Sequence, residues 1–243
     1  MDFLLQLNWV AIGQIILIDL LLGGDNAIVI ALACRNLPPH LRRKGILWGT
    51  FGAIAIRVVL IAFAVTLLQV AFIKFVGGLL LLWIGVKLLV DNDEGHGEIA
   101  ASDRLFSAIK TIVVADLVMS IDNVIAIASA AEQAGGDHRM ALVVFGILVS
   151  IPIIVWGSAL VLKLMERFPI IVTLGAALLG YLAGGMIVTD VAFLPWMEAH
   201  VPPHALSVSL LGMQVSIPGL TGAVAVVLAG TLLAKGRCSP QAG

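Results

Sequence analysis

Four aspartates and two asparagines lie in apolar sequence, in two passages that share the spacing Asp-x5-Asp-Asn. Carboxylate and amide oxygens are the ligands that hard divalent ions such as Mn²⁺, Mg²⁺ and Ca²⁺ prefer. The core of neither motif contains the Cys or His that zinc and copper sites favour. The two passages therefore predict an all-oxygen metal site made of Asp19, Asp25, Asn26, Asp116, Asp122 and Asn123.

Helix geometry decides which of these side chains can meet. Seven residues advance an α-helix by about 700°, nearly two turns, so Asp19 and Asn26 share a face. Asp25 lies about 100° away from Asn26 on a continuous helix. Gly23-Gly24 offers a place for the helix to loosen, which would redirect Asp25 and free backbone carbonyls as further ligands. The second copy has Ser120-Ile121 there, a weaker break signal, so the site is expected to be asymmetric.

Burial of these carboxylates in a membrane has an electrostatic consequence. Each charged side chain at bilayer depth costs about 2.5–3.5 kcal/mol, so the four acids must face one another, water or a cation. Without a metal, their mutual repulsion would leave some of them protonated at neutral pH. Entry of a metal would then expel protons, and proton coupling of metal movement is a hypothesis.

The elements that carry the motifs must be membrane helices. The chain has 243 residues, 60% apolar and 12% charged, with a mean hydropathy of +1.10. A soluble domain carries about 25% charged residues, so a water-soluble globule is excluded. The net charge of −1 offers no basic surface for nucleic acid.

Runs of about 20 apolar residues are long enough to cross a bilayer as helices. They predict an all-α fold with about seven transmembrane helices, near Trp9–Cys34, Ile46–Leu68, Phe72–Val90, Ala108–Ala131, Met140–Leu162, Ile170–Val188 and Ala205–Ala234.

The basic residues predict the orientation of these helices. Eleven of the 14 fall on one side of the predicted bundle and two, Lys74 and Arg139, on the other. The remaining one, Arg57, lies inside the second span. Because Lys and Arg collect in cytoplasmic loops, the N-terminus is expected outside and the C-terminus in the cytoplasm.

The two motifs belong to an internal repeat with an offset of 97 residues. The same offset pairs Arg42 with Arg139 and Gly49 with Gly146. We therefore expect a first three-helix repeat over residues 1–95, a second over 96–190, and a loop, a seventh helix and a short tail over 191–243. Since three is odd, the second unit enters the membrane from the opposite face. Secondary transporters use such inverted repeats to form a site between their halves.

Other polar residues receive weaker interpretations. Arg57 is expected to pair with an Asp, in a structural or a functional role. Glu132 and Asp190 end their spans and are expected at the surface. The segment 91–103 is interpreted as a cytoplasmic linker, with a weak metal-sensing role as the alternative. The stretch Pro195–His204 is expected to form an external loop, whose histidines His200 and His204 are interpreted as loop surface rather than metal ligands.

The passages Asp19-Leu-Leu-Leu-Gly-Gly-Asp25-Asn26-Ala and Asp116-Leu-Val-Met-Ser-Ile-Asp122-Asn123-Val resemble the paired motifs of the TerC family of bacterial membrane proteins. The resemblance covers about residues 9–190, and the length and span pattern are most similar to the YjbE-like branch. It implies a polytopic inner-membrane metal transporter, with manganese export linked to several members. The acidic motif residues of the family fall on the six positions named above.

These observations together favour a secondary transporter that exports a divalent cation, with Mn²⁺ as the expected ion, rather than an enzyme. The metal is expected as the transported substrate and no separate cofactor is expected; the bilayer is the other expected partner. Two alternatives stay open. One is an exporter of amino acids or other small solutes, and the other is an intramembrane aspartyl protease, because Gly23-Gly24-Asp25 approaches a Gly-x-Gly-Asp pattern with Leu22 at its first position.

Overall fold

The chain forms a bundle of helices, seen in a computed structural model that describes residues 24–63, 70–90, 101–133, 139–202, 206–210 and 213–237. A short helix, Gly24–Cys34, is the first described element. The helices and strands that follow are α3 (Pro39–Ala62), α5 (Ile73–Val90), α6 (Ala101–Gln133), α7 (Arg139–Arg167), α8 (Ile170–Val188), α9 (Leu194–His200), β1 (Ser207–Leu210), β2 (Met213–Ser216) and α10 (Ile217–Arg237).

Five of the described helices are long and apolar enough to cross a membrane: α3, α5, α7, α8 and α10. Their outward faces carry large apolar side chains such as Trp48, Phe51, Trp156 and Leu232, each more than half exposed, as a lipid environment requires. Helix α6 covers the predicted span Ala108–Ala131 with 33 residues, several of them charged. The predicted first span is described only from Gly24 on, so the number seven stays a prediction.

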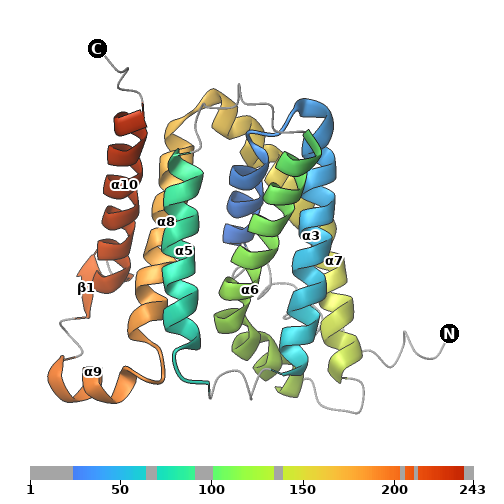
Figure 1. Ribbon diagram of the computed structural model, residues 1–243. Helices are drawn as coiled ribbons and strands as arrows, with labels where there is room; N and C mark the ends of the chain where they lie inside the picture. The colour runs from blue at the N-terminus through green and yellow to red at the C-terminus, as the bar shows by residue number, and fades with distance from the viewer. Residues whose placement is uncertain are drawn as a thin grey trace.

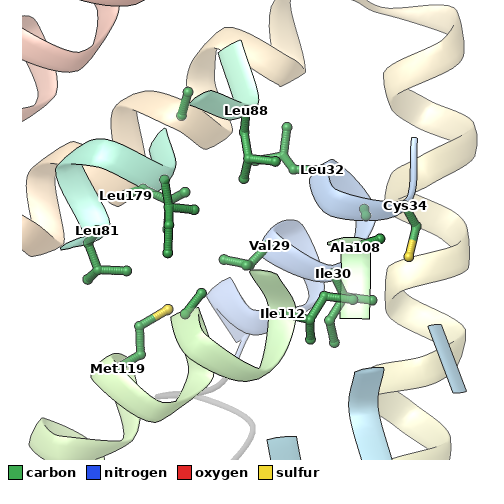
Figure 2. Packing of buried hydrophobic residues seen from close by; sticks show 14 of the residues in the cluster. Val29, Ile30, Leu32, Cys34, Leu81, Leu88, Ala108, Ile112, Met119 and Leu179 are labelled. Carbon is green, nitrogen blue, oxygen red and sulfur yellow. The ribbon is translucent and has the colours of Figure 1, made fainter. Parts of the chain in front are cut away.

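The helices pack in two groups around the short helix Gly24–Cys34 (Figure 1). Helix α3 packs along α6 and also contacts α7, whereas α5 packs along α8 and both contact α10. After Asp25 and Asn26 in its first turn, the short helix is apolar, and Val29, Ile30, Ala31 and Leu32 are all buried, which is typical of a central helix. Figure 2 shows Val29 and Leu32 among side chains of α5, α6 and α8.

Glycine contacts bring α8 and α10 close together. A Cβ at Gly184 would overlap the carbonyl oxygen of Pro218, and a Cβ at Gly180 would overlap that of Gly222. Gly180 and Gly184 are spaced as in the small-xxx-small pattern that lets membrane helices approach at their backbones. The predicted seventh helix thereby joins the bundle on its α8 side.

The basic ends of the helices meet at one end of the bundle. Arg42, in the first turns of α3, forms an ion pair with Glu166 at the end of α7. Arg35 donates a hydrogen bond to the carbonyl oxygen of Leu88 near the end of α5, at 2.7 Å. Helices α6 and α8 begin at this end and α10 finishes there (Figure 1). The predicted orientation depends on basic residues lying together at one end of the bundle. Which side of the membrane this end faces stays a prediction.

One prediction for residues 195–216, the start of the seventh helix, is wrong, whereas His200 is exposed, as expected of the loop before it. The expected external loop Pro195–His204 contains a helix, α9, in which His200 stacks on Trp196 and contacts its backbone oxygen through Nδ1, while His204 lies outside the described residues. The expected seventh helix, Ala205–Ala234, starts only at Ile217, because the strands β1 and β2 pair antiparallel before it, with Val208 opposite Val215. The sequence Ser-Val-Ser-Leu alternates polar and apolar residues, which is the period of a strand.

The prediction that Asp190 lies at the surface is also wrong. Its side chain is 0% exposed and follows the end of α8. The two carboxylate oxygens accept backbone N–H groups from Phe72, Lys74, Phe75 and Ala192 at 2.8–3.0 Å. These four hydrogen bonds replace the water that the span-end position would otherwise supply. The side chain of Glu132 lies outside the described residues, as does the linker segment 91–100.

Candidate functional site

A buried ion pair between α3 and α6 is the centre of the polar site. Arg57 of α3 is 2% exposed, and its Nη2 lies 2.5 Å from Oδ1 of Asp116, which is 5% exposed. The Nε group of Arg57 donates to Oγ of Ser120 at 3.1 Å, and this hydroxyl donates to Oδ2 of Asp116 at 3.2 Å. The expectation that Arg57 pairs with an Asp is thus confirmed, and the partner is Asp116.

Glycines of α3 explain why these two helices come close enough to pair. A Cβ at Gly49 would lie 2.5 Å from Cδ1 of Ile112, and a Cβ at Gly52 would lie 2.7 Å from Cγ2 of Val113. The absence of side chains there lets the α6 residues pack against the α3 backbone. Arg57 follows Gly52 by five residues, which places its long side chain beside the next turns of α6.

The polar residues of α6 share one face of that helix. Asp116, Ser120 and Asn123 follow the i, i+4, i+7 spacing, and all three are buried. Helix α6 is continuous from Ala101 to Gln133, so the weaker break signal at Ser120-Ile121 produces no break. Ser120 was not predicted as a site residue, although its position one turn after Asp116 is the signal that could have found it.

The short helix Gly24–Cys34 supplies two more polar residues at its described start. Asn26 is 4% exposed, and neither its Nδ2 nor its Oδ1 has a hydrogen-bond partner within the described part of the chain. Within the same part, Oδ1 of Asp25 is also buried without a partner. The charges of Arg57 and Asp116 both act on the Asp25 carboxylate, which places the first motif within electrostatic reach of the second.

Thr50 is a further buried polar residue, which was not predicted from the sequence. It lies on α3 between Arg57 and the end of the bundle where the basic residues gather. It precedes Arg57 by seven residues on α3, which puts both on one face about 10 Å apart along the axis. Thr50 is 2% exposed, and its Oγ1 has no hydrogen-bond partner among the described residues. Buried polar atoms usually have partners, so each unbonded atom marks a position where a ligand or water could bind.

The six predicted metal-binding residues are only partly described. Asp25, Asn26, Asp116 and Asn123 are buried or half-buried in the bundle interior. Asp19 and Gly23 lie outside the described residues, and so does the side chain of Asp122, whose backbone is part of α6. Within the described ranges, no three side chains of the His, Cys, Asp and Glu types gather into a group that could hold a metal ion. The described site offers at most two carboxylates, one of them already paired with Arg57.

Electrostatics make this pairing energetically important. A guanidinium stays charged at any physiological pH, so Arg57 needs an anion in the bundle interior. Removal of one partner from a buried pair costs about 3–5 kcal/mol, because the other charge is left uncompensated. The Asp25 carboxylate is the second anion near Arg57. The described part of the site therefore holds two carboxylates, one fixed cation and several unbonded polar atoms.

This arrangement defines a polytopic membrane protein with a charged site among its helices. The chain belongs to the integral membrane protein TerC family, whose model matches residues 4–236. The resemblance inferred from the two acidic motifs is thereby confirmed.

Several curated proteins are similar to this chain. The uncharacterized membrane protein YjbE of Bacillus subtilis (strain 168) is 46% identical over 185 residues, which cover 75% of this chain and 81% of YjbE. The uncharacterized membrane protein YceF of the same organism is 24% identical, with 72% and 70% covered. The UPF0053 inner membrane protein YgdQ of Escherichia coli (strain K12) is 24% identical over 212 residues, with 80% and 84% covered. No solved structure matches this chain.

Proposed function

We propose that this protein is a secondary transporter that exports a divalent metal cation, with Mn²⁺ as its substrate. The observation that carries the proposal is the set of unbonded, buried polar atoms on Asp25 and Asn26, in a bundle interior that also holds the buried Arg57–Asp116 pair. Hydrogen bonds left unmade in a protein interior cost free energy unless a ligand completes them. A hard cation bound by Oδ1 of Asp25 and Oδ1 of Asn26 would satisfy these two oxygens, whereas Nδ2 of Asn26 is a donor and needs an acceptor.

The substrate would be held between the two motifs. Asp25, Asn26, Asp122 and Asn123 would form the inner set of ligands, and Asp19 and Asp116 would complete it or carry protons. The inverted three-helix repeats, residues 1–95 and 96–190, would expose this site to each side of the membrane in turn. The N-terminus would lie outside and the C-terminus in the cytoplasm of the bacterial plasma membrane, so that export proceeds from the basic end.

The two alternatives fit the site less well. A small-solute exporter for amino acids needs a cation for the substrate carboxylate, but the guanidinium of Arg57 is already bound to Asp116. An aspartyl protease needs two carboxylates that share a proton, whereas Asp116 is held by a cation and a hydroxyl. Competition between Mn²⁺ and amino acids for uptake into vesicles would separate the first alternative from metal transport.

The proposed function is tested by manganese efflux from cells that carry Asp25→Asn or Asp122→Asn. Each change keeps the side-chain volume and removes a charge that the metal would bind, so we expect efflux and manganese tolerance to fall at least tenfold, a loss of about 1.4 kcal/mol of binding. Asp103→Asn is the matched control, because Asp103 lies exposed at the start of α6. Normal efflux in both variants, at expression equal to that of the control, contradicts the proposed site.

A further inference from the structure

The carboxylate of Asp116, which the proposed function assigns to the metal, already carries a cation that belongs to the chain. Arg57 approaches it through Nη2 at 2.5 Å, and both side chains are buried. Among the described residues, Arg57 is the largest side chain that is almost completely buried. A divalent ion that reaches Asp116 must therefore replace the guanidinium or share the carboxylate with it.

We propose that Arg57 is a tethered counter-ion that occupies Asp116 in the metal-free protein and releases it when the metal binds. The proposal rests on the proposed function, because it concerns the same site. It assigns to Arg57 a positioning role, in which the guanidinium and the metal compete for one carboxylate.

The chemistry of arginine suits this role. Its charge cannot be removed by deprotonation, so a released guanidinium needs another anion nearby. Asp25 provides one, since its carboxylate is already within electrostatic reach of Arg57. Ser120 steadies the paired state, because its hydroxyl bridges Nε of Arg57 and Oδ2 of Asp116. In the proposed cycle the guanidinium would leave Asp116 and turn toward Asp25, which would keep the interior close to neutral.

Only one of the two repeats carries this counter-ion. The position equivalent to Arg57 at the 97-residue offset is Ile154, which is buried and apolar. The second repeat therefore has an apolar side chain at the position where the first repeat has Arg57, the partner of Asp116. Because a bare carboxylate is costly in a membrane interior, a neutralised Asp116 would let the empty transporter return without a bound ion at this position. Net metal export is then possible without obligatory exchange.

A purely structural ion pair predicts a different behaviour. In that case, removal of Arg57 weakens folding and metal binding together, whereas competition predicts tighter binding once the competitor is gone. The affinity for Mn²⁺ alone therefore separates the two roles, and it is measurable without any transport.

The first experiment measures Mn²⁺ binding to the purified full-length chain in detergent, by titration calorimetry and by the metal-dependent rise in unfolding temperature. We expect Arg57→Gln to bind Mn²⁺ more tightly than wild type, by roughly 5- to 150-fold, the usual range for coupling between two ligands. Arg43→Gln is the matched control, because Arg43 is exposed on the same helix. It should bind Mn²⁺ as wild type does.

A second variant keeps the test decisive if Arg57→Gln does not fold. Arg57→Lys retains the charge but loses the Nε contact with Ser120, so the ammonium competes less well and Mn²⁺ should bind more tightly than to wild type. In vesicles, Arg57→Gln should retain exchange of labelled for unlabelled Mn²⁺ and lose net efflux.

The outcomes separate the two proposals. The tethered counter-ion is overturned if Arg57→Gln binds Mn²⁺ as weakly as wild type or more weakly. If Arg57→Gln is unfolded, the same result in Arg57→Lys overturns it. In either case, binding of Mn²⁺ by wild type still supports the metal site. A wild-type chain that neither binds nor transports Mn²⁺ overturns the proposed function and this inference with it.

Discussion

Asp190 holds the backbone of Phe72, although the two residues are 118 positions apart in the sequence. Oδ1 accepts the N–H of Phe72 at 2.9 Å, and Oδ2 accepts those of Lys74 and Phe75 at 3.0 Å each. Phe72 has a φ of 67°, a left-handed conformation that bulky residues rarely adopt. Asp190 therefore caps the first turn of α5 from the end of α8 and fastens these helices together.

The loss of this cap should destabilise the protein. Asp190→Ala would leave four backbone N–H groups without their acceptor, so we expect a loss of at least about 2 kcal/mol, the upper end for a helix cap. Asp190→Asn keeps one acceptor oxygen and should fall between this variant and wild type. The measurement is the unfolding temperature of purified protein in detergent, and an unchanged value for Asp190→Ala would contradict the assigned role.

The same carboxylate should make stability depend on pH only in the acid range. Burial acts to raise the pKa of Asp190, but hydrogen bonds from Ala192, Phe75, Phe72 and Lys74 outweigh it, so the net pKa lies below the ordinary value of 3.8. A lowered folded pKa means that the contribution is present above about pH 3.8 and is lost as the pH falls through the folded pKa. Wild type should therefore lose more stability than Asp190→Asn below about pH 4. Parallel curves of unfolding temperature against pH would exclude this assignment.

The apolar segments were predictable from sequence because hydropathy directly reflects the bilayer. The predicted span Ile170–Val188 coincides with α8, where Pro169 precedes the apolar run. Helix α3 starts at Pro39 rather than at Ile46, because proline favours the first turn of a helix while polar residues there add nothing to hydropathy. Hydropathy thus located the apolar spans, but it could not locate the polar helical turns that precede them, as at the start of α3.

The partner of Arg57 could not be predicted, because it depends on which helices pack together. A buried arginine needs an anion, and four aspartates were available in sequence. The choice of Asp116 follows from the contact of Gly49 with Ile112, which places α3 along α6. Nothing in the local pattern of either helix specifies that contact.

The glycine contact between α8 and α10 should tolerate no side chain. A Cβ at Gly184 meets the backbone oxygen of Pro218, which cannot rotate away, whereas a Cβ at the neighbouring Gly185 meets nothing within 4 Å. We expect Gly184→Ala to cost about 1–3 kcal/mol through overpacking. Gly185→Ala is the matched control and should be neutral or slightly stabilising, because alanine favours helix. The unfolding temperature of both variants is the measurement, and equal effects would contradict close packing at Gly184.

The unbonded amide of Asn26 predicts that an apolar replacement keeps or raises the stability of the metal-free protein but loses metal binding. Burial of an amide without a hydrogen bond costs about 1–3 kcal/mol in protein mutants, and no described group bonds the Asn26 side chain. Asn26→Leu should therefore leave the metal-free protein as stable as wild type or more so. Loss of a metal ligand should at the same time abolish the rise in unfolding temperature that Mn²⁺ produces.

The control for Asn26 is a buried polar residue that already has a partner. Ser158 is 0% exposed and donates to the carbonyl oxygen of Ile154 at 2.7 Å. Ser158→Ala should leave the Mn²⁺ response intact, since the Ser158 hydroxyl is bonded within its own helix and is not part of the proposed metal site. A clear loss of stability in metal-free Asn26→Leu would mean that the amide is structurally satisfied. A preserved Mn²⁺ response in that variant would remove Asn26 from the metal site, because an apolar side chain cannot bind the ion.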